Sequence, residues 1–159
     1  MTTSEMVDVA PETVHQLEWV LMQLADDLGD GFQLDAKTLD HALFGSVPSC
    51  HGALALEADR TVAGGVLFSP VMSTTDGASG VYVTDLWVAK SKRGQALGPR
   101  LLAHAARGAR GMWQARFMRL VSYGSNKRAR AVYDRLGFVE NHDETVLQIG
   151  GVAFEQLMD

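Results

Sequence analysis

Two segments near the start of the chain repeat apolar residues at helical spacing. Residues 11–29 place an apolar side chain every three or four positions, which predicts a helix with one buried face. Pro11 suits the first turn of that helix, because proline lacks an amide hydrogen that this turn leaves unused. Residues 35–45 predict a second, shorter helix, which Asp35 can cap and Gly45 can end.

Short apolar runs in the middle of the chain predict β-strands. Residues 51–58 and 61–71 flank a turn at Asp59 and Arg60, and we expect them to form an antiparallel hairpin. Residues 81–88 are apolar on both faces, which is typical of a central strand covered on both sides. Only Thr84 and Asp85 interrupt this run, and an isolated carboxylate there requires a reason.

The second half of the chain continues the alternation of helices and strands. An apolar stripe after Gly98 predicts a helix, and we expect a strand at 117–123, a helix at 126–136 and late strands at 145–149 and 152–157. The expected order is strand, two helices, three strands, helix, strand, helix and two strands, which predicts an α/β fold with a mixed sheet. The loop after the 81–88 strand lies at a carboxyl end, where open α/β sheets bind ligands.

Composition is typical of one globular domain spanning residues 1–159. The chain has 159 residues, of which 47% are apolar and 21% charged. No apolar run approaches the about 20 residues of a spanning helix, and the first residues lack the basic start of a signal peptide. Cys50 is the only cysteine, which excludes an internal disulfide. We therefore expect a cytoplasmic protein with no membrane partner.

The net charge of −5 hides a strong segregation of charge along the sequence. Residues 90–135 contain twelve Lys and Arg residues and one acid, Asp134, whereas the rest of the chain has two basic and eighteen acidic residues. One part should attract phosphates and the other should attract cations. No zinc-finger spacing, basic zipper or aromatic RNA-binding signature accompanies the basic part, so we expect no nucleic-acid partner. The histidines lack metal-ligand spacing, so we expect no metal site.

The loop of residues 93–98 joins the central strand to a helix and is rich in small residues. Gly94, Ala96 and Gly98 allow a ligand to approach the main chain, whose amides and helix dipole favour an anion. Lys92 and Arg93 add formal positive charge. The loop is neither a Walker motif nor a dinucleotide fingerprint. Taken alone, these residues leave open both a diphosphate site and an ordinary turn.

Two motifs in this sequence resemble those of one enzyme family. The loop is similar to the acetyl-CoA motif Arg/Gln-x-x-Gly-x-Gly/Ala of the GNAT superfamily of N-acetyltransferases, and reads Arg93-Gly94-Gln95-Ala96-Leu97-Gly98. Residues 126–138, with a leading Asn, a Tyr and a final Gly-Phe, resemble the second hallmark of that family. Two further segments resemble the spermidine/spermine (diamine) acetyltransferase branch: Leu43-Phe44-Gly45 and Asp85-Leu86-Trp87-Val88. That branch carries Glu-Asp where this chain has Thr84-Asp85.

The resemblance implies a fold, a cofactor and a partner. The fold is a GNAT-like mixed, mostly antiparallel sheet of six or seven strands, flanked by about four helices, with a splayed central parallel strand pair. The cofactor is acetyl-CoA, and a homodimer joined through the late strands is expected. Ala96 replaces the usual first glycine of the motif, which we expect to be tolerated if its φ is negative. Pro99 lies in the first turn of the helix, where it removes one amide.

Acetyl transfer to an amine requires a base, because only about one part in a thousand of a primary amine with a pKa near 10 is neutral at pH 7. Asp85 is the candidate for binding the substrate ammonium and for accepting its proton through water. A chain of ordered water is the alternative base, and a purely structural role for Asp85 stays open. The resemblance implies that Tyr133 is the general acid that protonates the departing thiolate.

The remaining candidates form two groups. The resemblance assigns cofactor binding to the central strand, the loop after it and the helix at 126–136: Leu86, Trp87, Val88, Arg93, Gly94, Gln95, Ala96, Leu97, Gly98, Pro99, Asn126, Arg130 and Tyr133. Substrate binding is assigned to the acidic segment and the central strand: Asp26, Asp27, Thr84 and Asp85. A solvated acidic face is the alternative for the acidic segment, and a helix N-cap is the alternative for Asn126.

These expectations together describe an acetyl-CoA-dependent N-acetyltransferase that moves an acetyl group to a primary amine by direct attack in a ternary complex. The expected acceptor is a small cationic amine such as a diamine or polyamine. One alternative is a protein or peptide lysine/N-terminal acetyltransferase. The other, from a different functional class, is a non-catalytic coenzyme A-binding sensor.

Overall fold

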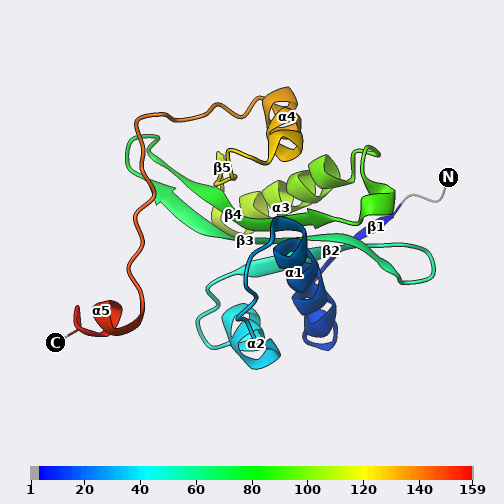
Figure 1. The fold of residues 1–159 in the computed structure, drawn as a ribbon, viewed down its shortest axis with the longest axis horizontal. Coiled ribbons are helices and arrows are strands. Elements are labelled where there is room, and N and C mark those ends of the chain that lie inside the picture. Colours follow the sequence, from blue (N-terminus) through cyan, green and yellow to red (C-terminus); the bar gives the residue numbers. More distant parts are fainter. Residues whose placement is uncertain (1–3, 159) are drawn as a thin grey trace. The chain divides into compact units, whose positions relative to one another are not determined.

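The computed structural model describes residues 4–158 and consists of two compact units, Met1–Tyr123 and Gly124–Asp159. The first unit contains a β-sheet with three α-helices (Figure 1). The second unit contains two further α-helices. The predicted central strand and its loop thus belong to the first unit, and the helix predicted at 126–136 belongs to the second.

A five-stranded sheet forms the centre of the first unit. Its strands lie side by side in chain order, and all neighbouring pairs are antiparallel except the parallel pair β4 and β5. The mostly antiparallel α/β architecture is therefore confirmed. The strands are β1 Glu5–Asp8, β2 His51–Leu56, β3 Val62–Ser73, β4 Ala78–Val88 and β5 Met118–Leu120.

The parallel pair is much shorter than β4 itself. Only Val81 to Val83 of β4 pair with β5, whereas β4 continues to Val88. Beyond Val83, the pairing recorded for the described part of the chain joins β4 to β3 alone. One edge of β4 is therefore free of strand pairing over its last five residues, Thr84 to Val88.

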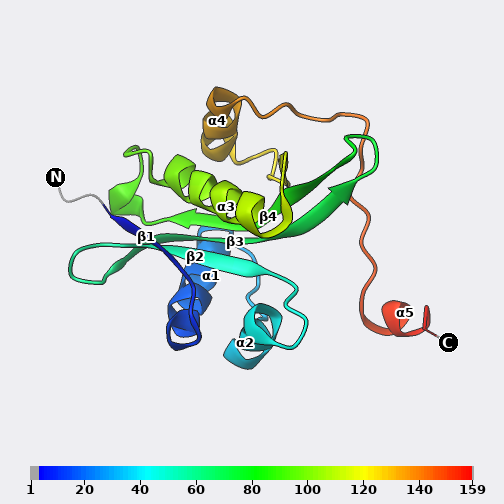
Figure 2. The same cartoon turned by 180° about the vertical axis from the view of Figure 1, so that it is seen from behind.

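Helices cover both faces of the sheet. The two helices α1 (Val14–Leu28) and α2 (Ala36–Phe44) lie on one face, and α3 (Leu97–Trp113) lies on the other (Figures 1 and 2). Gly29 ends α1 with a φ of 75°, a left-handed conformation that suits glycine. The carboxylate of Asp35 accepts a hydrogen bond from the amide of Thr38 and caps α2, as its sequence position predicts.

The core between the sheet and α1 consists of large aliphatic side chains. Leu17 and Val20 of α1 and Leu54 and Leu56 of β2 are at most 1% exposed. Each such side chain contributes about 1.5–3 kcal/mol by leaving water. Trp87 of β4 belongs to the same buried cluster, so the strand that carries Asp85 is fixed against α1.

The second unit differs from the sequence prediction at its end. Helix α4 (Lys127–Leu136) forms as predicted, but the segment expected as a strand at 145–149 has no regular structure. The segment expected as a strand at 152–157 instead contains the short helix α5, Gly151–Glu155.

The prediction of these two late strands was wrong, because neither segment has a strand to pair with. An alternating apolar pattern expresses a preference for a paired, half-buried surface, and an isolated strand is not stable. Within residues 4–158, the prediction of six or seven strands and about four helices is corrected to five strands and five α-helices. The strand predicted at 117–123 also shortens to Met118–Leu120.

Candidate active site

Thr84 forms a β-bulge in β4. Asp85 and Val83 pair with consecutive residues of β3, so Thr84 between them has no partner across the ladder. Val83 lies opposite Phe68, whose ring centroid is 6.3 Å from that of Trp113 of α3, so Val83 shares the α3 face. The extra residue turns Asp85 to the opposite face, which α1 covers.

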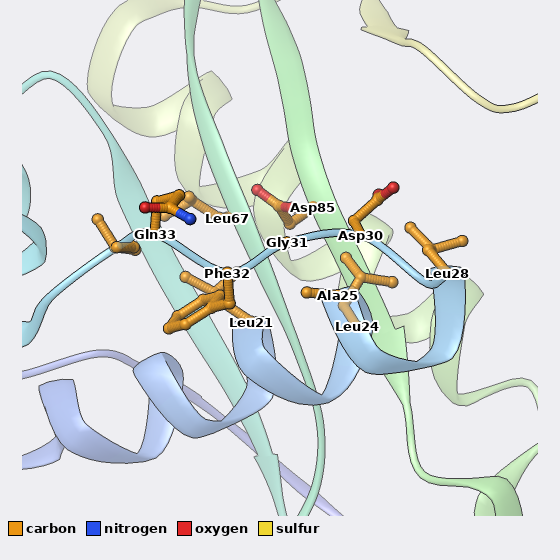
Figure 3. A pocket seen from close by; sticks show the side chains of 11 residues that line it. Leu21, Leu24, Ala25, Leu28, Asp30, Gly31, Phe32, Gln33, Leu67 and Asp85 are labelled. Carbon is orange, nitrogen blue, oxygen red and sulfur yellow. The ribbon is translucent and has the colours of Figure 1, made fainter.

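A cavity of about 280 Å³ lies beside Asp85 on this face. Its walls come from α1, the loop after α1, β3 and β4, and the Asp85 side chain points into it (Figure 3). The lining is mainly apolar, with polar groups from three residues only. The lining residues are Leu21, Leu24, Ala25, Leu28, Asp30, Gly31, Phe32, Gln33, Leu34, Leu67 and Asp85.

Asp85 is a partly buried carboxylate without a compensating partner. Burial raises the pKa of Asp85, and neither a hydrogen bond nor a neighbouring charge in the described part of the chain opposes this shift. The structural alternative, a carboxylate that caps nearby amides, therefore lacks the hydrogen bonds that it needs. An ammonium group entering the cavity would supply the missing positive charge and stabilise the ionised form.

The main-chain groups of Leu86 and Val88 face the free edge of β4. Alternate residues of an antiparallel strand direct both main-chain groups toward the same neighbour. The amide of Ala89 donates to the carbonyl of Ala63 at 2.9 Å, so Ala89 and Trp87 face β3. Leu86 and Val88 therefore face away from β3, and their amides are open to an extended ligand that carries amide groups of its own.

The loop between β4 and α3 presents unpaired main-chain amides to solvent. Gly94, Gln95 and Ala96 are exposed. Within residues 4–158, the amides of Gly94 to Gly98 donate no hydrogen bond, and the first main-chain bond of α3 comes from Arg100. An added Cβ at Gly94 would meet no atom within 4 Å. These amides and the start of a 17-residue helix have the features that the predicted anion site requires.

The basic side chains before this loop are engaged by carboxylates. Lys92 Nζ lies 2.7 Å from Glu57, and the guanidinium of Arg93 forms an ion pair with Asp27. Hydrogen bonds from Lys92, then Ser4, hold the pKa of Glu57 below its usual value. The charge that the sequence assigned to the loop is therefore balanced within the protein, and an anion would be held mainly by main-chain amides.

Ala96 has a left-handed backbone, with a φ of 58°. The condition under which alanine was expected to be tolerated here, a negative φ, is therefore not met. The chain must reverse direction between the short 3-10 helix Lys90–Lys92 and α3, and glycine normally occupies such a position. Leu97 is buried as the first residue of α3, and Pro99 lies in its first turn as expected.

Asp26 and Asp27 are neighbours in α1 but differ in their contacts. Asp26 is exposed and takes part in none of the side-chain hydrogen bonds or ion pairs found between residues 4 and 158. Asp27 accepts a hydrogen bond from Trp87 Nε1 at 3.0 Å and lies 3.0 Å from Lys90 Nζ, besides its pair with Arg93. Burial opposes ionisation, but the hydrogen bonds from Lys90, Trp87 and Arg93 lower the pKa of Asp27.

Three predicted site residues lie in the second unit. Asn126 is the N-cap of α4, since its side-chain oxygen accepts a hydrogen bond from the amide of Ala129 at 3.2 Å. Arg130 is ion-paired with Glu140. Tyr133 packs against Phe138, with 5.5 Å between ring centroids, and burial raises its pKa.

Sequence reasoning missed most of the cavity wall. Phe32 and Gln33 belong to a loop, and no periodic pattern shows which way a loop side chain points. Asp30, which also lines the cavity, accepts a hydrogen bond from Tyr123 Oη at 3.0 Å, and this bond raises the pKa of Tyr123. Charge alone marked this part of the chain as acidic, but the partners of each carboxylate required the structure.

The residues around the free edge and the loop fit an acyl-coenzyme A molecule. Five unpaired amides, from Gly94 to Gly98, precede a helix and suit a diphosphate. The main-chain groups of Leu86 and the amide of Val88, which no strand pairs, suit the amide-bearing arm of such a carrier. Within residues 4–158, none of the helices has the length and apolar character that crossing a lipid bilayer requires.

Several solved structures share this fold at low sequence identity. An integron cassette protein from V. cholerae is 18% identical with a TM-score of 0.76, covering 99% of both chains. A ribosomal-protein-alanine N-acetyltransferase from Brucella melitensis biovar Abortus 2308 is 16% identical with a TM-score of 0.73, covering 92% of this chain and 99% of its own. The aminoglycoside N-acetyltransferase AAC(6')-Iy, solved in complex with CoA, is 18% identical with a TM-score of 0.76, covering 96% and 97%.

The sequence itself carries the family signal. No curated protein sequence matches the chain. The family model described as "Acetyltransferase (GNAT) family" matches residues 14–138, which is most of the chain and includes both motifs. With the matching fold, the exposed amide loop and the free strand edge, the chain belongs to the GNAT acetyltransferase family and is an acyltransferase that uses acetyl-CoA.

Proposed function

We propose that this enzyme acetylates the primary amine of a small cationic molecule by direct attack in a ternary complex. One observation carries the proposal: two consecutive residues of β4 open to the cavity and to the free strand edge respectively. The Asp85 side chain lines the cavity, and the main-chain groups of Leu86 face the free edge. An amine held by Asp85 would therefore lie next to a thioester held along the edge.

The cavity favours an amine carried on a slender, partly apolar group. Its volume of about 280 Å³ and its leucine and phenylalanine walls suit methylene groups, while Asp85 and Asp30 supply negative charge. A diamine or polyamine combines these features, since it has cationic ends and an apolar chain. The raised pKa of Asp85 makes its carboxylate a better proton acceptor than an ordinary aspartate, directly or through water.

Tyr133 is the proposed general acid. Its position in the second family motif supports this role, and its raised pKa keeps the phenol protonated at neutral pH. The phenol would protonate the thiolate of coenzyme A as it departs. We further propose that the whole chain works as one acetyltransferase domain, with the loop from Arg93 to Pro99, Asn126 and Arg130 around the cofactor.

A homodimer is also proposed. Its support is the set of large apolar side chains exposed near the end of the chain, such as Leu147 at 87%, Val152 at 74% and Leu157 at 69%. Exposed apolar side chains gathered in one segment are typical of interaction sites. Analytical ultracentrifugation should give a dimer for the full chain, and the triple change of these residues to Ser should give a monomer. A monomeric wild-type protein would overturn this part of the proposal.

The acceptor is tested by thioester consumption with a panel of amines. We expect spermidine or putrescine to be acetylated, with a lysine-containing peptide and an aminoglycoside as the comparison arms. Asp85→Asn should remove the preference for the cationic amine, whereas Asp76→Asn, a change in the exposed β3–β4 turn, should not. Preferred turnover of the peptide or the aminoglycoside would overturn the diamine or polyamine assignment.

A further inference from the structure

Asp27 of α1 binds three groups from one short segment, residues 87–93, which lies at least 60 residues further along the chain. Its carboxylate contacts the indole of Trp87, the ammonium of Lys90 and the guanidinium of Arg93. The side chains of Asp27 and Arg93 are only 20% and 24% exposed, whereas that of Lys90 is 77% exposed. The bond to Trp87 is the partly buried one, whereas the Lys90 pair is solvent-exposed and worth little.

Arg93 links Asp27 to the free edge of β4. While its terminal nitrogen bonds Asp27, its Nε donates a hydrogen bond of 2.9 Å to the carbonyl oxygen of Val88. The rigid fork of the guanidinium suits two such bonds at once. Asp27 thus fixes the side chain of one edge residue, Trp87, and through Arg93 the carbonyl of the next, Val88.

These bonds act on the part of β4 that β3 supports on one side and no strand pairs on the other. β5 pairs only as far as Val83, so the end of β4 lacks the ladder that normally holds a parallel strand on both sides. The Val88 carbonyl is occupied by Arg93, which leaves the Val88 amide as the free group of that residue at the edge. The Val88 N–H lies in the peptide plane that joins Val88 to Trp87, and the Val88 carbonyl lies in the next plane. The direction of the amide is therefore set by the hold on Trp87 together with the hold on that carbonyl.

We propose that Asp27 is a positioning residue, which acts through Trp87 and Arg93 to aim the Val88 amide at the thioester carbonyl. The proposal rests on the proposed placement of acetyl-CoA along the β4 edge and deepens it. It also replaces the simpler idea that Asp27 attracts the amine, because its charge is already matched by Arg93 and Lys90. A hydrogen bond from a fixed amide polarises the carbonyl and stabilises the oxyanion that forms on attack.

Infrared difference spectra of bound acetyl-CoA, labelled with ¹³C at the acetyl carbonyl, test this directly. Wild-type enzyme should shift the carbonyl stretch to lower wavenumber. Asp27→Asn should lose this shift and reduce kcat by up to about 100-fold, the cost of a misplaced reacting group, with an unchanged KM for the amine. Asp40→Asn is the control, since it removes an exposed carboxylate of α2 that takes part in no side-chain hydrogen bond or ion pair found between residues 4 and 158, and it should keep both the shift and kcat.

Arg93→Lys covers the case in which Asp27→Asn does not fold. Lysine keeps the positive charge beside Asp27 but cannot bond that carboxylate and Val88 with a planar fork, so it should also lose the infrared shift. Lys90→Ala should leave the shift intact. A normal shift in folded Asp27→Asn or Arg93→Lys, or an equal rise of the amine KM in Asp26→Asn and Asp27→Asn, would overturn the proposal.

The infrared readout also separates this inference from the proposed function. It needs bound acetyl-CoA but no amine, so a wrong acceptor assignment leaves it unchanged. A wild-type complex without any carbonyl shift would instead contradict the placement of the thioester on the β4 edge, whatever the variants do.

Discussion

Asp85 and Leu86 are consecutive residues of β4 that open to different surroundings, the first to the α1 cavity and the second to the unpaired strand edge. The side chain of Asp85 lines the cavity, while the main-chain groups of Leu86 face away from β3. This relationship places a carboxylate and an edge amide one residue apart. Changes at either position should therefore affect the reaction more than the fold.

Asp85→Asn should lower activity and raise stability at neutral pH. Asparagine cannot accept a proton, and the loss of a general base typically costs 10²–10⁴-fold, so kcat/KM for the amine should fall within about that range. The raised pKa of Asp85 means that its ionised form is unfavourable in the folded state. The neutral amide avoids that cost, so the melting temperature at pH 7 should increase.

The stability gain from Asp85→Asn should depend on pH in a defined direction. A carboxyl whose pKa is raised on folding destabilises the protein as pH rises from the unfolded value, about 3.9, through the folded value. Below that window both states are protonated, and the difference between wild type and variant should vanish. Chemical denaturation at a series of pH values measures this difference, and a constant difference from acid to neutral pH would contradict it.

The pH dependence of kcat/KM in the wild-type enzyme should report the ionisation of Asp85. Binding of an ammonium requires ionised Asp85, so kcat/KM should rise with pH through a pKa above the ordinary value of aspartate. Steady-state rates from acid to neutral pH give this limb of the profile. Asp85→Asn should remove it, whereas Asp76→Asn should leave it in place.

Tyr133→Phe should lower kcat with little change in folding. The substitution removes only the phenol oxygen and keeps the ring that packs on Phe138, so we expect a loss of about 10²–10⁴-fold, the usual contribution of a general acid. Tyr123→Phe is the control, because it removes an exposed phenol that bonds Asp30. Equal rates for wild type and Tyr133→Phe would rule out Tyr133 as the acid.

Ala96→Gly should stabilise the first unit. A left-handed backbone costs a non-glycine residue about 1–2 kcal/mol, and glycine removes this cost. Glycine also makes the unfolded chain more flexible, which offsets part of the stabilisation. We expect a net gain of up to about 1 kcal/mol in the free energy of unfolding. Ala106→Gly, inside α3, should instead lose about 0.5–1 kcal/mol. A destabilised Ala96→Gly would contradict the observed φ.

Local apolar patterns correctly predicted the helices and strands that pack or pair with segments close to them in the sequence. Helix α1 and strands β2 to β4 match the periodicity of their apolar residues, and Asp85 was identifiable as a carboxylate inside an apolar strand. The prediction of the late strands was wrong because a strand needs a neighbouring strand to pair with, and no pattern within 145–157 shows whether one is present. The same limit hid the contact between Asp27 and Arg93, which are 66 residues apart in the chain.

Because Thr84 forms a β-bulge, the shape of β4 depends on the number of its residues as well as on their identity. Loss of the single codon for Thr84 would leave Val83 on the α3 face and Asp85 on the α1 face, because the regular alternation of a strand would then take over. The strand would nevertheless lose the local bend and added twist that a bulge provides just where pairing with β5 stops. A shortened gene product of this kind would keep Asp85 on the α1 face but would favour longer pairing between β4 and β5, which would close the free edge of β4.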